Sequence, residues 1–559
     1  MQRVKNGLKN HLGLTIFLAL LATLISTLVG LTYCEPFVEW AERFKESGDY
    51  ELVEITDDNK PELVTLFPNS GLSNSAFKDG WIPSYFERIT GYKVDYQQAT
   101  NGQDELVQAI LAGKEKYHML KLEGGTYLKN VSNNAFVDLK PALEKYGKNL
   151  YGENGVGGVI PKEAWDAVTD PETGAIYAIP ETGFSGMIMS ALVWNLDQLA
   201  EVGITKIPET ISEVNDAFHK LQDHFGASDP LYHAFATGGA QAYIGPLAAA
   251  WELPENFYVT GNNEIQHVMY HPQYSVYMSW LVGLKESKIL AAGWEGWGSA
   301  DLITQFANEK LGCGYINYWS INDIARKIAV EKGISEDEAR EKIGWTLFVR
   351  GDGELGTVKQ KEAKYISYQT IGYYCAVPIH MAKYTPWVID WIDQRITNEA
   401  FEGFRLGEEG VHHEFVEAGT EGALEVTISG QKKWVKILPQ YELDILPGSM
   451  YQCGGNPVVG KELWCLSEQT YNAWDVLVEI DSPNAIKNPL AMAPYIKGWS
   501  EIDIECRSWV LTYEQQLING KSSQVERRLL SLKNNWTSKW WTSEVNSNVQ
   551  AWHQSKNKN

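Results

Sequence analysis

The chain has 559 residues, of which 44% are hydrophobic and 21% charged, and its formal net charge is -23. The length allows two or three compact domains, and the composition excludes a disordered or collagen-like chain. The negative charge argues against a nucleic-acid binder, which must neutralise phosphates with Lys and Arg, and against docking of the folded body on an anionic membrane. The 21 Trp and 28 Tyr residues suit either large cores or flat apolar faces for a ligand with ring faces and hydroxyls.

The N-terminus has the features of an export signal. Basic residues in MQRVKNGLK precede an uncharged apolar run from Leu12 to Tyr33. This is the order of a secretory signal, and the run is long enough to span a bilayer. Cys34 follows directly, as in a bacterial lipoprotein signal whose Cys is lipidated, although Tyr33 stands where that signal has a small residue. We expect residues 1–34 to export the chain and to anchor it, either through lipid on Cys34 or as a retained membrane segment.

The body begins with alternating strands and helices. Residues 35–61 are acidic and polar and predict a spacer. From Glu62 onwards, strand and helix patterns alternate in the order ELVTLF, WIPSYFERIT, YKVDYQQ, DELVQAILAG and YHMLKLEGG. This order predicts parallel strands joined by right-handed crossovers, and Gly91 is expected to end the first of these helices. Ligands of such sheets bind beyond the carboxyl ends of the strands, so we expect a site at the loops PNSG, QQATNGQ and LEGGTY.

The middle and the tail of the chain add further strands and many helices. GCGYINYW and YYCAVPI read as strands, and TPWVIDWIDQRIT reads as a helix that Thr385 opens with Pro386 at its first position. Trp387 and Trp391 lie four residues apart on that helix beside Ile392, a spacing that favours packing in a core. The tail VERRLLSLKNNWTSKWWTSEVNSNVQAW is helical and rich in Trp.

No sequence signature of catalysis, metal binding or a cofactor is found. The chain has no G-x-S-x-G, no H-E-x-x-H and no G-x-x-x-x-G-K-[ST]. RLGEEGVHHEFV, residues 405–416, crowds acids and histidines, but the adjacent His412 and His413 point to opposite faces of a strand and could not ligate one ion. We therefore predict no catalytic residue, no metal and no cofactor, and a structural turn in which one His is paired with a carboxylate.

The cysteines after Cys34 contain no C-x-x-C pair, which argues against zinc ribbons and thioredoxin-like motifs. Cys453 and Cys465 flank the Gly-rich turn CGGNPVVGKELWC, so a local disulfide between them is one pairing that the sequence leaves open. The five cysteines are Cys313, Cys375, Cys453, Cys465 and Cys506.

Several motifs in a fixed order carry a family resemblance. Thr90-Gly91 ends a helix before a strand, and Ala135-Phe136-Val137-Asp138-Leu139 follows the next strand. TGAIYAIPETG, VWNLDQLAEVGITKIPETISE and RLGEEGVHHEFV come later. Together they resemble family 1 extracellular solute-binding proteins, the sugar-capturing components of ATP-driven importers, and the last motif resembles the large Gram-positive lipoprotein branch. The resemblance covers roughly residues 62–559.

The resemblance implies an α/β, two-lobe, type II periplasmic-binding-protein-like fold with a hinge, an interlobe ligand cleft and an extra helical C-terminal segment. We expect residues 62–183 and 370–430 to form lobe 1, and residues 184–369 and 431–559 to form lobe 2. The family function is capture of a solute, here expected to be an oligosaccharide, by lobe closure. The protein would then be a monomer anchored at the extracellular face of the membrane, delivering the ligand to an ABC permease and its ATPase subunits.

Candidate ligand contacts are residues that suit sugar hydroxyls or sugar ring faces and that lie at strand ends or lobe crossings. Trp319 is the leading candidate for a stacking platform, because it ends a strand where lobe 2 should face the cleft. The full set is Asn69, Ser70, Gln98, Asn101, Glu123, Thr182, Phe184, Trp294, Trp297, Asn317, Tyr318, Trp319, Tyr373 and Tyr374.

Two other functions stay open. An extracellular glycan-degrading enzyme also has an acidic, aromatic-rich surface, and it needs two carboxylates about 5 to 10 Å apart, which a pair from Glu123, Glu181 and Glu295 could supply. Alternatively, the protein senses a ligand and reports it to a signalling receptor instead of importing it.

Overall fold

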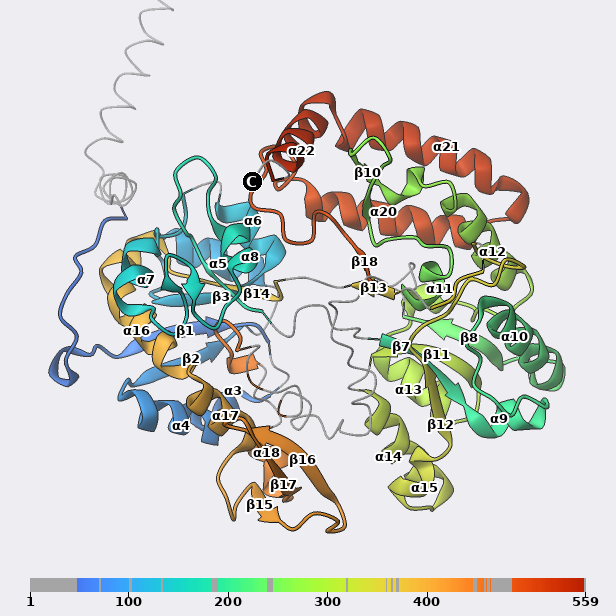
Figure 1. The fold of residues 1–559 in the computed structure, drawn as a ribbon, viewed down its shortest axis with the longest axis horizontal. Helices are drawn as coiled ribbons and strands as arrows, with labels where there is room; N and C mark the ends of the chain where they lie inside the picture. The colour runs from blue at the N-terminus through green and yellow to red at the C-terminus, as the bar shows by residue number, and fades with distance from the viewer. Residues whose placement is uncertain are drawn as a thin grey trace, which may run out of the picture.

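The computed structural model contains two α/β lobes that lie side by side, with C-terminal helices over the second lobe (Figure 1). This arrangement confirms the two-lobe α/β fold. The predicted export segment, residues 1–34, lies outside the described residues, which are 48–69, 72–99, 103–131, 134–182, 190–238, 245–317, 320–357, 359–362, 365–367, 371–445, 450–456, 459, 463 and 485–556.

The sheet of the first lobe combines three early strands with two that border the lobe crossings. Its order is β2-β1-β3-β14-β6. The early strands are parallel, as predicted, and β14 runs antiparallel to both β3 and β6. The chain therefore leaves this lobe after β6 and returns to it at β14. The strands are β1 (Leu63–Phe67), β2 (Val94–Gln98), β3 (Met119–Glu123), β6 (Ile179–Pro180) and β14 (Tyr373–Ala376).

Helices cover both faces of this sheet (Figure 1). The helix before β2 ends where the sequence predicts: Gly91 has a φ of 70°, and its N–H donates to the Glu87 carbonyl at 2.8 Å. This left-handed C-cap favours glycine. The helices are α3 (Asn74–Asp79), α4 (Trp81–Thr90), α5 (Gln103–Leu111), α6 (Gly124–Val131), α7 (Lys140–Tyr146), α8 (Lys162–Val168), α16 (Thr385–Arg395) and α17 (Asn398–Leu406), and a short hairpin joins β4 (Gly152–Glu153) to β5 (Val156–Gly157).

The His-rich segment opens a small antiparallel sheet attached to the first lobe. The order is β15-β17-β16, and α18 (Gln440–Asp444) follows. The backbone N–H of Glu408 donates to His412 Nδ1 at 2.8 Å, and His412 Nε2 lies 3.1 Å from Asp444 Oδ2. The prediction of one His paired with a carboxylate in a structural turn is confirmed. The strands are β15 (His413–Val416), β16 (Ala423–Ile428) and β17 (Gln431–Ile437).

The second lobe has a four-stranded sheet in the order β12-β7-β11-β8. β11 is parallel to β8 and antiparallel to β7. All six residues of β7 are buried, as expected of a strand covered on both faces. The strands are β7 (Ser190–Asn195), β8 (His233–Thr237), β11 (Leu311–Asn317) and β12 (Ile343–Thr346), and the helices are α9 (Leu196–Glu201), α10 (Ile211–Phe225), α11 (Gly245–Ala249), α12 (Tyr274–Glu286), α13 (Ser299–Ala307), α14 (Ile321–Lys332) and α15 (Glu336–Arg340).

The C-terminal helices cap the second lobe, which confirms the predicted extra helical segment (Figure 1). Trp499, Trp536 and Trp540 bury their rings in the core of that lobe, so much of the Trp in the tail serves packing. Within the described ranges, no helix combines the length and the apolar character needed to cross a bilayer. The helices are α20 (Asp503–Ile518), α21 (Val525–Asn535) and α22 (Ser543–Lys556), with the strand pair β9 (Phe257–Val259) and β10 (Ile265–His267) beside them.

A segment that we name the strap, residues 488–499, contacts both lobes. It follows β18 (Ala485–Lys487), which pairs in parallel with β13 (Tyr365–Ser367). In the strap, Ile496 and Trp499 belong to the core of the second lobe, whereas Met492 packs against the core of the first lobe. The strap therefore joins the lobes away from the main sheets.

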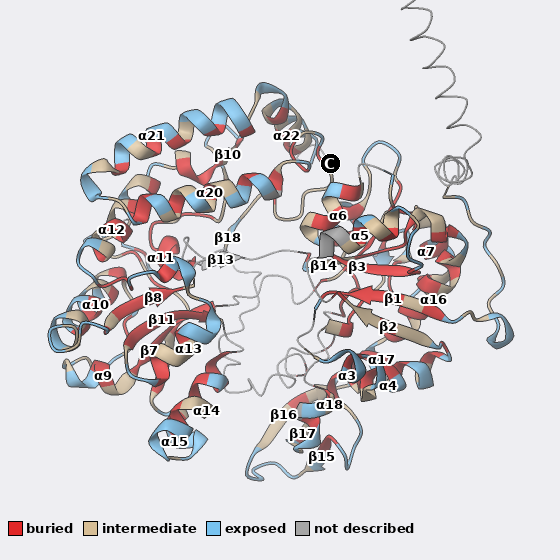
Figure 2. Ribbon diagram, turned by 180° about the vertical axis from the view of Figure 1, so that it is seen from behind, coloured by how far each residue is buried: buried red, intermediate tan, exposed pale blue. Residues whose placement is uncertain are grey.

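Each lobe has its own large core, and Figure 2 shows β1, β3, β7, β8 and β11 as largely buried. The predicted lobe boundaries stay a prediction, but the two cores favour one adjustment. Val435, Tyr441 and Tyr451 pack in the core of the first lobe, although the predicted boundary assigns residues after 430 to the second lobe. We propose that the chain returns to the second lobe only after residue 463.

Candidate functional site

Five candidate residues gather at one edge of the first sheet. β1, β2 and β3 are parallel and end at this edge, and the antiparallel β14 begins there. Gln98 and Glu123 are the last residues of β2 and β3, Tyr373 is the first residue of β14, and Thr182 follows β6. Asn69 lies just beyond β1 and is exposed. The structure thus brings together polar side chains that the sequence could only assign to separate loops.

These residues differ in what they already contact. Gln98 Nε2 donates to the Leu72 carbonyl at 2.7 Å and to Asn74 Oδ1 at 3.1 Å, so this side chain braces the loop before α3. Tyr373 and Tyr374 point to opposite faces of the sheet, since they are neighbours on a strand. The ring of Tyr374 stacks on the Tyr127 ring at 4.3 Å, so Tyr373 is the one that shares a face with Glu123.

A buried ion pair lies on that same face. Lys121 is fully buried, and its Nζ lies 2.7 Å from Glu181 Oε2, 3.2 Å from the Met450 carbonyl oxygen and 4.5 Å from the centroid of the Tyr373 ring. Burying an ammonium without a partner costs several kcal/mol, so this lysine needs its carboxylate. Sequence reasoning missed Lys121; the only signal was a single lysine among the apolar residues of MLKL, before Glu123.

The carboxylate of this pair lies where the chain leaves the first lobe. Burial raises the pKa of Glu181 to about 7, and the nearby charge of Lys121 opposes the rise. Glu181 donates its backbone N–H to the Tyr373 carbonyl at 2.8 Å, which fixes it beside β14. Segment 450–456 covers this point closely: a Cβ on Gly455 would lie 1.5 Å from the Thr182 carbonyl oxygen. Only glycine fits there, because any side chain would displace the crossing.

The second lobe offers a smaller polar group at the end of its sheet. Asn317 ends β11 opposite Ser190, the first residue of β7, and Ser190 Oγ donates to Asn317 Oδ1 at 2.5 Å. Trp297 is half-buried and makes a T-shaped contact with His233, at 6.2 Å between ring centroids. Trp294 is fully buried in the core. Its ring therefore packs the lobe, and this burial does not favour the predicted ligand contact.

The remaining candidates lie outside the described residues, so their predicted contacts stay predictions. They include the leading platform, Trp319, and also Ser70, Asn101, Phe184 and Tyr318.

The three carboxylates weighed for an enzyme are not gathered in one place. Glu123 and Glu181 belong to the first sheet. Glu295 lies in the second lobe, where it lines a groove of about 590 Å³ with residues of α20 and α21, among them Arg528. Within the described ranges, no group of three or more His, Cys, Asp or Glu is arranged to hold a metal ion.

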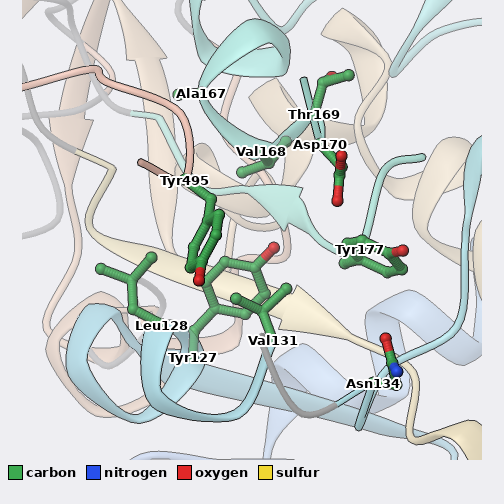
Figure 3. Close-up of a pocket in the computed structure, with 10 residues that line it drawn as sticks. All are labelled: Tyr127, Leu128, Val131, Asn134, Ala167, Val168, Thr169, Asp170, Tyr177 and Tyr495. Carbon is green, nitrogen blue, oxygen red and sulfur yellow. The ribbon is translucent and has the colours of Figure 1, made fainter. Parts of the chain in front are cut away.

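A separate cavity lies where the strap contacts the first lobe (Figure 3). Its volume is about 160 Å³, and it is lined by Tyr127 of α6, Tyr177, Asp170 and Tyr495 of the strap, together with apolar residues of α6 and α8. The strap therefore closes a recess of the first lobe with an aromatic ring. The sequence carried no signal for this contact, since Tyr495 lies more than 300 residues from the rest of the lining.

The family comparison covers more than half of the chain. The model described as "Bacterial extracellular solute-binding protein" matches residues 70–378. A search of curated proteins found no match.

Solved structures share the fold across most of the chain. The Streptococcus pneumoniae ABC-transporter substrate-binding protein FusA, in complex with kestose, has a TM-score of 0.63 at 12% identity, covering 89% of this chain and 100% of that one. The N-glycan transport solute-binding protein NgtS from the same organism has a TM-score of 0.56 at 14% identity, with 89% and 100% covered. The alginate-binding protein AlgQ2 without calcium ion has a TM-score of 0.58 at 12% identity, with 89% and 98% covered. At these identities the likeness shows the fold alone.

Proposed function

This chain belongs to the bacterial extracellular solute-binding proteins, and from that premise we propose that it captures a neutral oligosaccharide between its two lobes. The observation that carries the proposal is the edge of the first sheet, where Gln98, Glu123 and Tyr373 stand together at strand ends. Carboxylate and amide groups suit the paired hydroxyls of a sugar, and a tyrosine ring suits its C–H face. The similar structures of FusA with kestose and of the N-glycan transporter NgtS support this class of ligand.

The net charge of the protein narrows the range of ligands that it would bind. With a formal net charge of -23, the protein repels an acidic ligand such as a uronic acid polymer, because the summed field acts before any contact forms. The cluster of polar candidate residues in each lobe is also small: Ser190 and Asn317 in the second lobe are neutral, and the candidates in the first lobe include one acid, Glu123. We therefore favour a neutral oligosaccharide over a charged one.

The mechanism of capture is lobe closure. A ligand that contacts Glu123 in the first lobe and Asn317 in the second gains all of its interactions only when both lobes approach it. Its differential affinity for that arrangement then shifts the population toward closure. None of these steps requires a bond to be made or broken in the ligand.

Delivery and attachment follow from the same proposal. The closed protein hands its ligand to an ABC permease with its ATPase subunits at the extracellular face of the membrane. The protein acts as a monomer held at its N-terminus, either by lipid on Cys34 or by a retained apolar segment. The mass of the mature N-terminus distinguishes the two, because a lipidated chain begins at Cys34 and carries the extra mass of the acyl groups.

The test is a thermal-shift and calorimetry screen of the purified chain against oligosaccharides of fructose, of mannose with N-acetylglucosamine, and of uronic acid, with peptides as a further class. A ligand at 100 times its Kd stabilises the folded state by about 2.7 kcal/mol. We expect a neutral oligosaccharide to raise the Tm and to be recovered intact by mass spectrometry. A cleaved product would support the glycan-degrading enzyme instead, and a shift by peptides alone would reject a carbohydrate ligand.

Matched variants then test the site. Glu123→Gln and Asn317→Ala remove one polar contact from each lobe, and each should weaken binding at least about tenfold, equivalent to about 1.4 kcal/mol. Glu115→Gln and Asn308→Ala change the same residue types at exposed positions of the same lobes, and they should leave the affinity unchanged. Equal effects of site and control variants would place the ligand elsewhere.

A further inference from the structure

Two thiols from distant parts of the chain meet inside the first lobe. Cys375 lies in the middle of β14 and is 1% exposed, and Cys453 lies in segment 450–456 and is 3% exposed. The Cys375 thiol donates a hydrogen bond to the Cys453 sulfur. Cys465, the nearer cysteine in sequence, lies outside the described residues. The tertiary structure thus offers Cys453 a partner that sequence spacing did not.

Positive groups surround this pair. Arg395 Nη1 donates to Cys453 Sγ at 3.7 Å, and Lys121 stands directly opposite Cys375 in the register of β14 and β3. Burial opposes ionisation of Cys453, but the hydrogen bond from Cys375 and the charges of Arg395 and Lys121 outweigh it and lower the pKa of this thiol. Burial raises the pKa of Cys375, and so does the hydrogen bond that it donates. The folded lobe therefore holds the two sulfurs together, in position for a disulfide.

We propose that Cys375 and Cys453 form a disulfide that ties β14 to segment 450–456. The oxidant is a small-molecule disulfide. One of the two protein thiols loses its proton to water, attacks one sulfur of the small disulfide and releases the first small thiol; the other protein thiol then loses its proton to water, attacks the protein sulfur of the mixed disulfide and releases the second. Two protein thiols are oxidised and one small disulfide is reduced to two thiols. Because both sulfurs are buried in the folded lobe, the exchange takes place while the exported chain folds, before segment 450–456 covers β14.

The disulfide would hold together the segments at which the chain passes between the lobes. β14 is the strand on which the chain returns to the first lobe, and it pairs with β6, on which the chain leaves it. Segment 450–456 also packs against Thr182 through Gly455. A bond between Cys375 and Cys453 therefore joins the return strand to the segment that covers the exit. The oxidised protein should keep β14 and segment 450–456 folded to a higher temperature than the reduced protein, since the cross-link restricts the unfolded chain.

The experiment maps the linkage in the wild-type full chain, refolded with oxidised glutathione and digested with trypsin without reduction. Cleavage after lysine separates the three relevant thiols into the peptides 365–383, 437–461 and 462–487. We expect peptide 365–383 linked to peptide 437–461, at a mass two hydrogen atoms below the sum of the two. Free thiols on both peptides, or a link between 437–461 and 462–487, would overturn the proposal.

A pair of variants adds a second readout. Cys375→Ser should abolish both the linked peptide and the oxidant-dependent rise in Tm, which we expect to be about 5 °C in the wild type. Cys313→Ser removes an equally buried thiol from the core of the second lobe and should leave both unchanged. The mapping needs no ligand, so its failure would leave the proposed oligosaccharide binding untouched, and the absence of a ligand would leave the disulfide untouched.

Discussion

Glu181 in the first lobe and Glu514 on α20 against the second lobe are both buried acids, and burial raises the pKa of each to about 7. Their partners differ. Glu181 is paired with Lys121 at 2.7 Å, whereas Glu514 accepts a hydrogen bond from the Tyr274 hydroxyl at 2.5 Å, and no Lys or Arg in the described ranges is paired with it. Similar pKa values thus arise from a buried ion pair in one lobe and from an acid hydrogen-bonded to a neutral partner in the other.

The difference indicates where each lobe keeps buried charge. The first lobe holds a lysine, an acid and two thiols around β3, β14 and segment 450–456, beside the crossings. The second lobe has a neutral pair, Ser190 and Asn317, at the end of its sheet, and its buried acid lies on α20, against Tyr274 of α12. An ion pair at the crossing costs desolvation in any arrangement of the lobes, so its retention there fits a structural role in fixing β6, β14 and segment 450–456 together.

The largest expected effect comes from breaking the ion pair. Lys121→Met keeps the volume but leaves Glu181 buried without its cation, which should lower the free energy of unfolding by about 3 to 5 kcal/mol at neutral pH. Urea unfolding followed by tryptophan fluorescence measures this loss. Lys116→Met, at an exposed position just before β3, is the matched control and should change stability by less than about 0.5 kcal/mol. If Lys121→Met also lowered the free energy of unfolding by less than about 0.5 kcal/mol, the ion pair would contribute nothing to stability.

An intermediate effect, here a gain in the free energy of unfolding, is expected from replacing Glu514, the buried acid that has no cation. Because folding raises the pKa of Glu514 from its ordinary value to about 7, the stability that its protonated form contributes is complete below about pH 4.5 and is lost as the pH rises through 7. Glu514→Gln keeps the acceptor for Tyr274 and removes the charge. It should therefore be more stable than the wild type at pH 8, by roughly 2 kcal/mol, and no more stable at pH 4.5. Thermal unfolding at the two pH values measures the difference, and an advantage that did not depend on pH would exclude titration of Glu514 as its cause.

The smallest expected effect comes from the strap, which contacts both lobes. Tyr495→Ala removes a half-buried ring from the cavity of the first lobe and should cost about 1 kcal/mol. Tyr513→Ala removes a half-buried ring from α20, where it packs on Trp509 within the second lobe. We expect hydrogen exchange of α6 to accelerate only in the Tyr495 variant, since of these two rings only Tyr495 lies against α6. Equal exchange in both variants would mean that the strap does not brace the first lobe.

Much of the fold could be predicted because its signals are local. The period-2 and helical patterns from Glu62 to Glu123 predict the parallel strands and their helices, and Gly91 marks a helix end through its own conformational freedom. Pro386 likewise marks the first turn of α16 through its fixed φ. Each of these signals depends on neighbours within a few residues, so no knowledge of the rest of the chain was needed.

The candidate site was predictable only in part. Loop position assigned Gln98 and Glu123 to strand ends of the first lobe, and these ends share one edge because the strands are parallel. Tyr373 was assigned to a lobe crossing, and only the antiparallel pairing of β14 with β3 brings it to the same edge. Trp294 was a candidate ligand contact and is fully buried, since a Gly-rich neighbourhood does not reveal which of two nearby tryptophans packs in the core. Lys121 was missed, because nothing near it in sequence announces the acid that compensates its charge.

The amino-acid sequence by itself determined the alternation of strands and helices and the helix caps, because these follow from residues close together in the chain. Only the tertiary structure decided that β14 would lie between β3 and β6, that Lys121 would meet Glu181, and that Cys453 would meet Cys375. These pairings join segments from tens to hundreds of residues apart. Burial and charge compensation select them, and both depend on the packing of the whole lobe rather than on any local pattern.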